Sequence, residues 1–406
     1  MQSYTWLHPL QPILPRRLHP SRSTCNALDY RQLGNSDLHV SSLCFGTMLF
    51  GESTDRQTAY HLLNTATEAG INFFDSAEMY PVPQSPNTHG RSEVILGNWF
   101  KQLKQQESRK SRSDFVIATK ISGPGSMDWI RSGPSCVDAK NISEAIDGSL
   151  KRLQTDYIDL IQIHWPDRYV PMFGSIEYDP LLAYSSIPIE EQLEALHKAV
   201  HSGKVRYIGL SNETPWGLMK FCTATSTPST SNDNPNPIPC IPPPPPRPIS
   251  LQNAYNLTCR TFDSSGLAEC CLQENVSLLA YSPLAMGLLT GKYIDMKNSP
   301  PEARLNKYKG RYAEAESRYG PKVNVHVAIA EYAAVAKRYG MSLTELALRF
   351  VLEHPLVASA VIGATGVEQL GESVEIAERV KMQGKLEDNI RAAVDAIHAR
   401  YPNPTP

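Results

Sequence analysis

Short apolar segments alternate with amphipathic segments along most of this chain, from about residue 30 onward. The short segments are rich in β-branched and aromatic residues, and the segments between them carry apolar residues at three- and four-residue spacing. This alternation is typical of parallel strands joined by crossover helices. Eight strands are predicted, the number that closes a small barrel. They lie at 42–45, 72–75, 115–120, 158–164, 207–211, 249–253, 277–281 and 358–362.

Further elements are predicted around these strands. Turn residues in the middle of 30–40 indicate a β-hairpin ahead of the first strand, and this hairpin could plug the barrel floor. Two helices, 325–339 and 342–353, precede the last strand, with Gly340 as a C-cap between them. The predicted fold is therefore α/β, a (β/α)8 TIM barrel with an N-terminal β-hairpin and extra helices in its C-terminal half. Other helices are expected at 56–69, 143–153, 189–201 and 366–377.

The predicted barrel domain covers residues 29–400, and one internal segment breaks its pattern. Residues 223–248 hold ten of the chain's 32 prolines together with Ser, Thr and Asn, a composition that cannot form a core. We interpret them as an exposed insertion between a helix and the sixth strand. A docking site for an SH3- or WW-like partner is the alternative to a solvated loop. Residues 401–406 form a short tail.

The first 28 residues have the composition of an organelle transit peptide. They contain Arg16, Arg17 and Arg22, together with Ser, Pro and His, and no acidic residue. A transit peptide would place the protein in a chloroplast or mitochondrion. The alternative is a disordered leader that carries no targeting signal, and the expected location is then cytoplasmic.

The composition of the whole chain argues against several classes of partner. The 406 residues have a net charge of −2 and no basic stripe, so no nucleic-acid partner is predicted. No apolar stretch approaches the roughly 20 residues that a membrane-spanning helix needs, so no membrane partner is predicted. The eight cysteines include no Cys-x-x-Cys pair, and no His-Glu-x-x-His motif occurs, so no metal site is expected. The sequence does not define the oligomeric state.

Four polar residues stand where a barrel enzyme carries its chemistry. Asp75, Lys120 and His164 end the second, third and fourth predicted strands, and Tyr80 lies in the loop after the second. Each of them alone has a structural explanation, such as a cap, a loop tyrosine or a satisfied core histidine. Because active sites of parallel barrels lie at the carboxyl ends of the strands, the four together predict a proton-transfer site.

The chemistry of these side chains explains why they belong together. A phenol has an ordinary pKa of about 10, and a neighbouring ammonium stabilises its anion, so Lys120 is expected to lower the pKa of Tyr80. A buried lysine tends to lose its proton, so Asp75 is expected to hold Lys120 as a cation. His164 is expected to hydrogen-bond the substrate oxygen and to set its position.

These residues and their neighbours resemble the aldo-keto reductase family. The resemblance covers about residues 30–397, and it is closest to the bacterial Tas-type branch. It implies an eight-stranded barrel that transfers hydride from NADPH to a small-molecule aldehyde or ketone. The resemblance implies that Tyr80 is the proton donor, that Lys120 and Asp75 adjust its acidity, and that His164 orients the carbonyl. The segments that carry the resemblance are 74–80, 118–120 and 162–166, with 77–83 and 209–214 for the Tas-type branch.

The resemblance also implies a site for NADPH/NADP. Ser211, Asn212 and Gln252 match residues that bind the nicotinamide carboxamide, and Tyr281 matches a residue stacked on the nicotinamide ring. Residues 281–292 match the segment that covers the pyrophosphate. The full set of implied cofactor contacts is Ser211, Asn212, Gln252, Tyr281, Ser282, Leu284, Gly287, Lys292, Gly363, Thr365, Gln369 and Glu372.

Two positions near the implied adenosine site depart from the family pattern. The family usually has Pro where Ile362 stands and Asn where Ser373 stands. Arg304 is a candidate phosphate partner, and an exposed loop arginine is the alternative.

Other enzyme classes lack their motifs in this chain. No Gly-x-Gly-x-x-Gly follows a strand, which argues against a Rossmann dehydrogenase. Residues 209–213 end in Glu213 and fail the nucleophile-elbow pattern of α/β-hydrolases. The remaining alternative is a cofactor-binding regulatory subunit, because the potassium-channel β subunits belong to the same superfamily and keep the same four residues. The sequence does not identify the substrate, although Trp165 and residues 81–89 are expected to wall its pocket.

Overall fold

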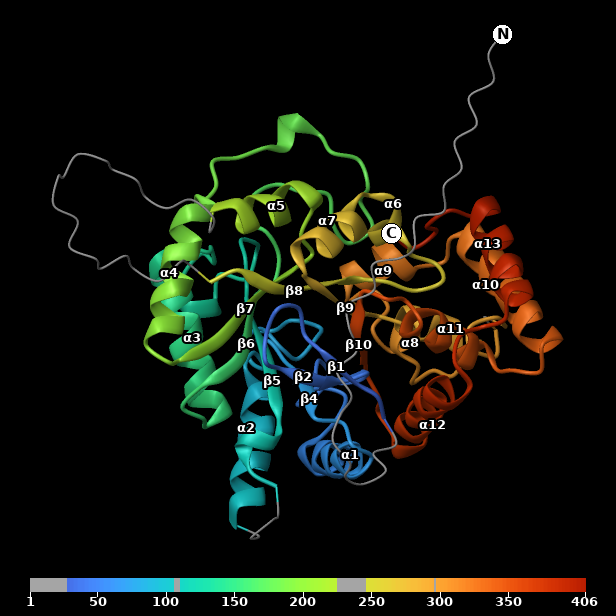
Figure 1. Ribbon diagram of the computed structural model, residues 1–406, viewed down its shortest axis with the longest axis horizontal. Coiled ribbons are helices and arrows are strands. Elements are labelled where there is room, and N and C mark those ends of the chain that lie inside the picture. Colours follow the sequence, from blue (N-terminus) through green and yellow to red (C-terminus); the bar gives the residue numbers. More distant parts are fainter. Residues whose placement is uncertain (1–27, 106–109, 225–245, 296) are drawn as a thin grey trace, which may run out of the picture.

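The structure is a closed barrel of eight parallel strands surrounded by helices. A computed structural model describes residues 28–105, 110–224, 246–295 and 297–406 (Figure 1). Consecutive strands pair in parallel from β3 to β10, and β10 pairs with β3 to close the barrel. The predicted TIM barrel is confirmed, and each predicted strand overlaps one observed strand. The barrel strands are β3 (Leu43–Gly46), β4 (Phe73–Asp75), β5 (Val116–Ile121), β6 (Ile158–Ile163), β7 (Val205–Ser211), β8 (Pro248–Ala254), β9 (Ser277–Tyr281) and β10 (Val357–Ile362).

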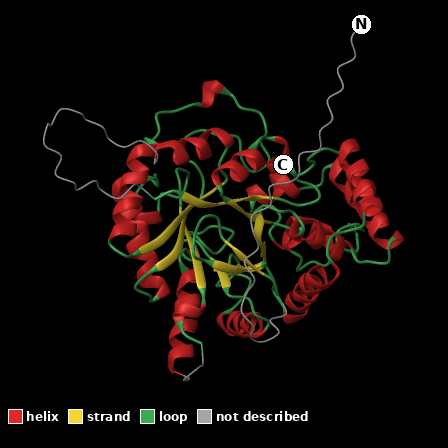
Figure 2. Ribbon diagram, in the orientation of Figure 1, coloured by secondary structure: helices red, strands yellow, loops and turns green. Residues whose placement is uncertain are grey.

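The strands are almost continuously buried, because their inner faces line the barrel and their outer faces meet helices. Every residue of β5 and β6 is buried, the pattern expected of parallel strands covered on both faces. Figure 2 shows the yellow strands enclosed by red helices. The helices are α1 (Arg56–Glu68), α2 (Arg91–Gln105), α3 (Ala139–Leu153), α4 (Ile189–His201), α5 (Pro215–Ala224), α6 (Thr261–Ser264), α7 (Leu267–Glu274), α8 (Arg304–Lys307), α9 (Ala313–Tyr319), α10 (Val323–Arg338), α11 (Leu343–Leu352), α12 (Val367–Gln383) and α13 (Asp388–Arg400). Short 3-10 turns are η1 (Arg112–Asp114), η2 (Ile130–Ser132), η3 (Pro180–Leu182) and η4 (Ala285–Thr290).

Helix ends follow the capping residues. The side chain of Asp138 accepts a hydrogen bond from the Asn141 backbone N–H at 2.7 Å, so α3 begins four residues before the predicted 143. The end of α10 is marked by Gly340, which has a φ of +71° and stands just beyond the cap residue Tyr339. α12 continues to Gln383, past the predicted end at 377.

The predicted hairpin is present and fills one end of the barrel. Strands β1 (Tyr30–Gln32) and β2 (His39–Ser41) pair antiparallel. The buried side chains of Leu33, Leu38 and Val40 cluster with barrel residues that include Phe73 and Ile249. Ile249 lies at the amino end of β8, so the hairpin plugs the end opposite to the strand carboxyl ends.

The structure describes the N-terminal leader and the Pro-rich segment only in part, and it describes the C-terminal tail in full. The leader falls almost wholly on residues 1–27, and most of the insertion falls on 225–245, both of which lie outside the described residues. The insertion is flanked by α5, which ends at Ala224, and by β8, which begins at Pro248. The tail is packed, since the fully buried Thr405 donates its backbone N–H to the Thr258 carbonyl at 3.1 Å. Among the described helices, none has the length and apolar character to cross a membrane.

Candidate active site

The four sequence-predicted catalytic residues meet at the carboxyl ends of the strands. Asp75 ends β4, Lys120 is the second-last residue of β5, and His164 directly follows β6. Tyr80 lies in the loop after β4, and its ring lies edge-to-face against the His164 imidazole with centroids 5.6 Å apart. All four are buried, with exposed fractions of 2%, 1%, 8% and 8% for Asp75, Lys120, His164 and Tyr80.

The Lys120 ammonium is the centre of the group. Its Nζ donates to Asp75 Oδ2 at 2.5 Å, to the Ser76 carbonyl at 2.8 Å and to the Tyr80 hydroxyl at 3.4 Å. Three acceptors match the three donors of an ammonium group. Asp75 is thus the ionic partner of Lys120, and the Tyr80 hydroxyl is a more distant hydrogen-bond acceptor.

The Asp75 carboxylate is held by two further side chains. Its Oδ1 accepts from Gln252 Nε2 at 2.8 Å and from Gln162 Nε2 at 3.2 Å. Gln162 was not among the residues predicted from the sequence. Its position two residues before His164 could have indicated that it belongs to the site, because alternate residues of a strand point to the same face.

The predicted lowering of the Tyr80 pKa is wrong, because the pKa of this phenol is raised. Burial raises the pKa of the Tyr80 phenol well above its ordinary value, and the negative charges of Asp75 and Glu314 raise it further. The main physical reason is burial, which disfavours the charged phenolate, and the Lys120 ammonium is also paired with Asp75, which lies nearer to it than the phenol does. Tyr80 therefore keeps its proton at neutral pH.

His164 is a neutral imidazole with an unsatisfied nitrogen. Burial lowers the pKa of His164 well below its ordinary value, and the charge of Lys120 lowers it further. Its buried Nδ1 has no hydrogen-bond partner among the described residues. A buried polar atom without a partner is costly unless a ligand or water meets it, so the site has hydrogen-bonding capacity to offer beside Tyr80.

The residues implied at the nicotinamide end form a chain of hydrogen bonds that reaches the catalytic group. Asn212, just after β7, donates from Nδ2 to the His164 carbonyl at 2.9 Å. The Tyr281 hydroxyl, at the end of β9, donates to Asn212 Oδ1 at 2.7 Å and accepts from Arg318 Nη1 at 2.7 Å. Ser211 Oγ donates to the Gln252 carbonyl at 2.8 Å. These residues therefore lie at the same end of the barrel as Tyr80.

Two cations stand at the segments implied to hold phosphates. In the loop after β9, Gly287 has a φ of +95°, and a Cβ there would lie 3.2 Å from Lys292 Nζ. Just after β10, a Cβ at Gly363 would have Arg304 Nη2 as its nearest neighbour, at 3.7 Å. Burial and the positive charge of Arg304 lower the pKa of Lys292, so the two cations are close enough to repel each other. Paired cations beside two side-chain-free glycines fit a polyanion such as a dinucleotide phosphate.

The remaining implied contacts lie around these two loops. Ser282 and Leu284 belong to the turn before η4, and the Ser282 carbonyl accepts from Asn256 Nδ2 at 2.9 Å. Gln369 and Glu372 are exposed on α12, and Gln369 Oε1 accepts from the Thr365 backbone N–H at 3.1 Å. Ser373, where the family usually has Asn, donates its hydroxyl back to the Gln369 carbonyl at 2.9 Å.

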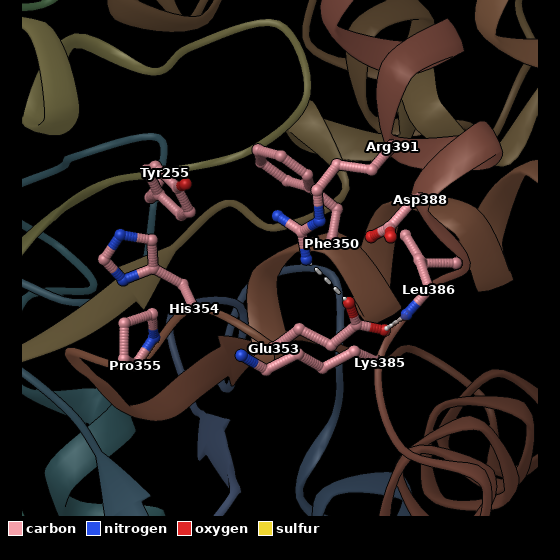
Figure 3. A pocket seen from close by; sticks show the side chains of 9 residues that line it. All are labelled: Tyr255, Phe350, Glu353, His354, Pro355, Lys385, Leu386, Asp388 and Arg391. Carbon is pink, nitrogen blue, oxygen red and sulfur yellow. Dashed lines mark hydrogen bonds and ion pairs between the residues drawn. The ribbon is translucent and has the colours of Figure 1, made fainter. Parts of the chain in front are cut away.

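A separate cavity of about 260 Å³ lies away from these residues (Figure 3). Its lining includes Tyr255, Phe350, His354, Lys385 and Arg391, and none of the four catalytic residues lines it. Its buried carboxylate, Glu353, already accepts from the Leu386 N–H and from Arg391. Glu353 is thus paired with Arg391 inside the protein, and the cavity contains none of the four catalytic residues.

Residues 42–388 match the Aldo/keto reductase family. The chain belongs to this family. It is 37% identical to the protein tas of Escherichia coli strain K12 over 380 residues, which cover 93% of this chain and all of that protein. It is also 37% identical over 303 residues to an aldo-keto reductase of Babesia bovis, covering 72% of this chain and 98% of that protein. A probable voltage-gated potassium channel subunit beta of Oryza sativa subsp. japonica is 30% identical over 379 residues, covering 91% of this chain and 97% of that protein.

Membership of the aldo/keto reductase family makes the protein an NAD(P)H-dependent oxidoreductase, and the predicted resemblance to the Tas-type branch is confirmed. Within the described part of the chain, no group of three or more His, Cys, Asp or Glu residues is placed to hold a metal ion.

Proposed function

We propose that the protein is an NADPH-dependent reductase of small aldehydes or ketones. The observation that carries the proposal is the contact set at the strand ends, where a protonated phenol lies 3.4 Å from a buried ammonium and against a neutral imidazole. Such a group can hold a carbonyl oxygen and deliver one proton to it.

Each residue has a distinct part in this proposed reaction. When bound, NADPH supplies the hydride that reduces the carbonyl carbon. His164 and Tyr80 hydrogen-bond the carbonyl oxygen, and Tyr80 gives its proton to that oxygen as negative charge develops there. Lys120 then stabilises the phenolate that remains, because its ammonium already contacts the hydroxyl. Asp75 holds the Lys120 ammonium in place.

The preference for NADPH over NADH is supported by the two cations near Gly287 and Gly363. Lys292 is placed beside the segment implied to cover the pyrophosphate. Arg304 is placed beside the segment implied to meet the adenosine end, where NADPH differs from NADH by one phosphate. A guanidinium group suits this phosphate because it can donate two parallel hydrogen bonds.

Arg304→Met is expected to weaken NADPH binding about tenfold, which corresponds to about 1.4 kcal/mol, while NADH binding changes much less. The measurement is the quenching of intrinsic fluorescence during titration with each dinucleotide. Arg311→Met is the matched control, because Arg311 lies on the α8–α9 connection with an exposed side chain that makes a 3.7 Å contact to Glu52 and lies over the Tyr308 ring. An equal loss of NADPH and NADH affinity in Arg304→Met would remove this residue from the discrimination.

The pH dependence of carbonyl reduction follows from the directions of two pKa shifts. Tyr80 must be protonated, and its pKa is raised, so the acid form persists above the ordinary phenol range. His164 has a lowered pKa, so it stays neutral well below the ordinary histidine value. With NADPH saturating, kcat/KM is expected to stay constant from about pH 6 to about pH 9. A titration centred near the ordinary histidine pKa of about 6.5 would contradict a neutral His164.

The proposed function is tested by titration with NADPH and NADH, followed by a screen of aldehydes and ketones. We expect steady consumption of NADPH with at least one carbonyl compound and release of the matching alcohol. Tight NADPH binding without turnover across the panel would reject the reductase.

The same experiment distinguishes a second candidate function, a cofactor-binding regulatory subunit. The observation in its favour is the 30% identity to the rice protein named as a probable potassium channel subunit beta. Cofactor binding without turnover, together with co-purification of a membrane protein, would favour this second function.

A further inference from the structure

Gln162 lies inside the barrel between the catalytic group and the residues implied at the nicotinamide. It belongs to β6, where its register partners are Lys120 on β5 and Gly209 on β7. Its side chain is fully buried. Figure 1 shows β6, β7 and β8 next to one another in this part of the barrel. No step of the proposed reaction uses this glutamine.

Gly209 leaves the space through which Gln162 reaches past β7. A Cβ at Gly209 would lie 3.2 Å from Gln162 Cγ and 2.4 Å from Ser250 Oγ, so a side chain there would displace the serine and crowd the glutamine. Beyond β7 lies β8, which carries Gln252, and Gln252 Nε2 donates to Gln162 Oε1 at 3.3 Å. The two glutamines therefore meet inside the barrel although their strands are not neighbours.

The charge of Asp75 fixes the direction of both glutamine amides. Asp75 is paired with the Lys120 ammonium, and its Oδ1 accepts from Gln252 Nε2 at 2.8 Å and from Gln162 Nε2 at 3.2 Å. An ionised carboxylate only accepts hydrogen bonds, so each glutamine must turn its NH2 group toward Asp75. The carbonyl oxygen of Gln162 is then free to accept the second N–H of Gln252.

Gln252 consequently has its two N–H groups occupied and its carbonyl oxygen available. One N–H contacts Asp75 and the other contacts Gln162, whereas no described residue donates to Gln252 Oε1. The Gln252 backbone carbonyl accepts from Ser211 Oγ at 2.8 Å and from the Asn212 N–H at 3.1 Å. Gln252 thus lies beside the other two residues implied at the nicotinamide carboxamide, with an acceptor to offer to an amide N–H.

We propose that Gln162 is a positioning residue for the dinucleotide, which holds the Gln252 amide so that Oε1 accepts a hydrogen bond from the carboxamide NH2 group of the nicotinamide. This inference rests on the proposed NADPH-dependent function. Without Gln162, one N–H of Gln252 loses its acceptor and the amide gains rotational freedom, which binding must then remove at a cost in affinity. Because Gln162 also binds Asp75, one side chain orients both the residue that contacts the cofactor and the partner of Lys120.

The test compares the binding of NADP⁺ with that of its acetylpyridine analogue, in which a methyl group replaces the carboxamide NH2 group. The analogue has no N–H to donate to Gln252 Oε1, so the ratio of the two dissociation constants reports this one hydrogen bond. Both constants come from intrinsic fluorescence titration, which needs no carbonyl substrate. Gln162→Met keeps the length of the side chain and removes both polar atoms. Gln192→Met is the matched control, because Gln192 on α4 is also buried and its Nε2 donates to the Ile187 carbonyl at 2.9 Å.

Wild-type protein is expected to bind NADP⁺ about tenfold more tightly than the analogue, the effect of one well-placed hydrogen bond. In Gln162→Met this ratio is expected to fall to about twofold. Gln252→Met should lower the ratio equally, and the double variant Gln162→Met/Gln252→Met should lower it no further, because Gln162 acts through Gln252. Gln192→Met should keep the wild-type ratio.

A wild-type ratio in folded Gln162→Met would overturn the inference, and so would equal binding of the two dinucleotides by the wild type. Thermal unfolding shows whether the variant is folded. Gln162→Asn gives the same test if the methionine variant does not fold, because the shorter amide cannot reach both Asp75 and Gln252. These results leave the reductase function to be judged by the carbonyl screen, since the ratio is measured without turnover. Failure of the wild type to bind either dinucleotide would instead reject the proposed function and the inference together.

Discussion

Replacing Tyr80 by Phe is expected to lower kcat/KM for carbonyl reduction by about 10²- to 10⁴-fold, the range typical of a general acid. The substitution removes one hydroxyl and keeps the ring that packs against His164. NADPH affinity should stay nearly unchanged, because the hydroxyl acts on the substrate oxygen. Steady-state kinetics and fluorescence titration measure the two quantities on the same preparation.

Tyr332→Phe provides the matched control for this prediction. Tyr332 on α10 is also a buried tyrosine, and its hydroxyl donates to the Leu257 carbonyl at 2.9 Å. Loss of that bond should cost about 1 kcal/mol of stability and leave kcat/KM in place. Unchanged turnover in Tyr80→Phe would mean that another group supplies the proton.

The strand-end residues could be predicted from the sequence because the barrel geometry fixes their place. A residue at the carboxyl end of a parallel strand must lie at the same rim as its counterparts on neighbouring strands, whatever the loops do. The prediction of Asp75, Lys120 and His164 as site residues required only that the strands be assigned. The direction of the Tyr80 pKa shift could not be predicted in this way, because it depends on how deeply the phenol is buried and on the negative charges of Asp75 and Glu314 around it.

The α9 residues could not be predicted for a different reason. α9 is seven residues long and lies in a connection whose place is set by contacts with Tyr281, Pro406 and the loop near Gly174. No periodic pattern in the sequence encodes such distant contacts.

Lys120→Met is expected to lower the free energy of unfolding by about 3–5 kcal/mol, because it leaves the buried Asp75 carboxylate without its ionic partner. The two glutamine amides that contact Asp75 compensate only part of the lost interaction. Urea unfolding followed by circular dichroism measures the loss. Lys204→Met is the control, since its ion pair with Asp147 is largely exposed and should contribute less than about 1 kcal/mol.

The double variant Asp75→Asn/Lys120→Met separates the structural part of this pair from its chemical part. With neither charge buried, the free energy of unfolding should recover most of what Lys120→Met loses. Carbonyl reduction should nevertheless remain low, because no ammonium is left to stabilise the Tyr80 phenolate. Recovered activity in the double variant would show that Lys120 serves only to neutralise Asp75. A stable and inactive double variant would instead mean that the barrel tolerates the loss of the pair and that the chemistry requires it.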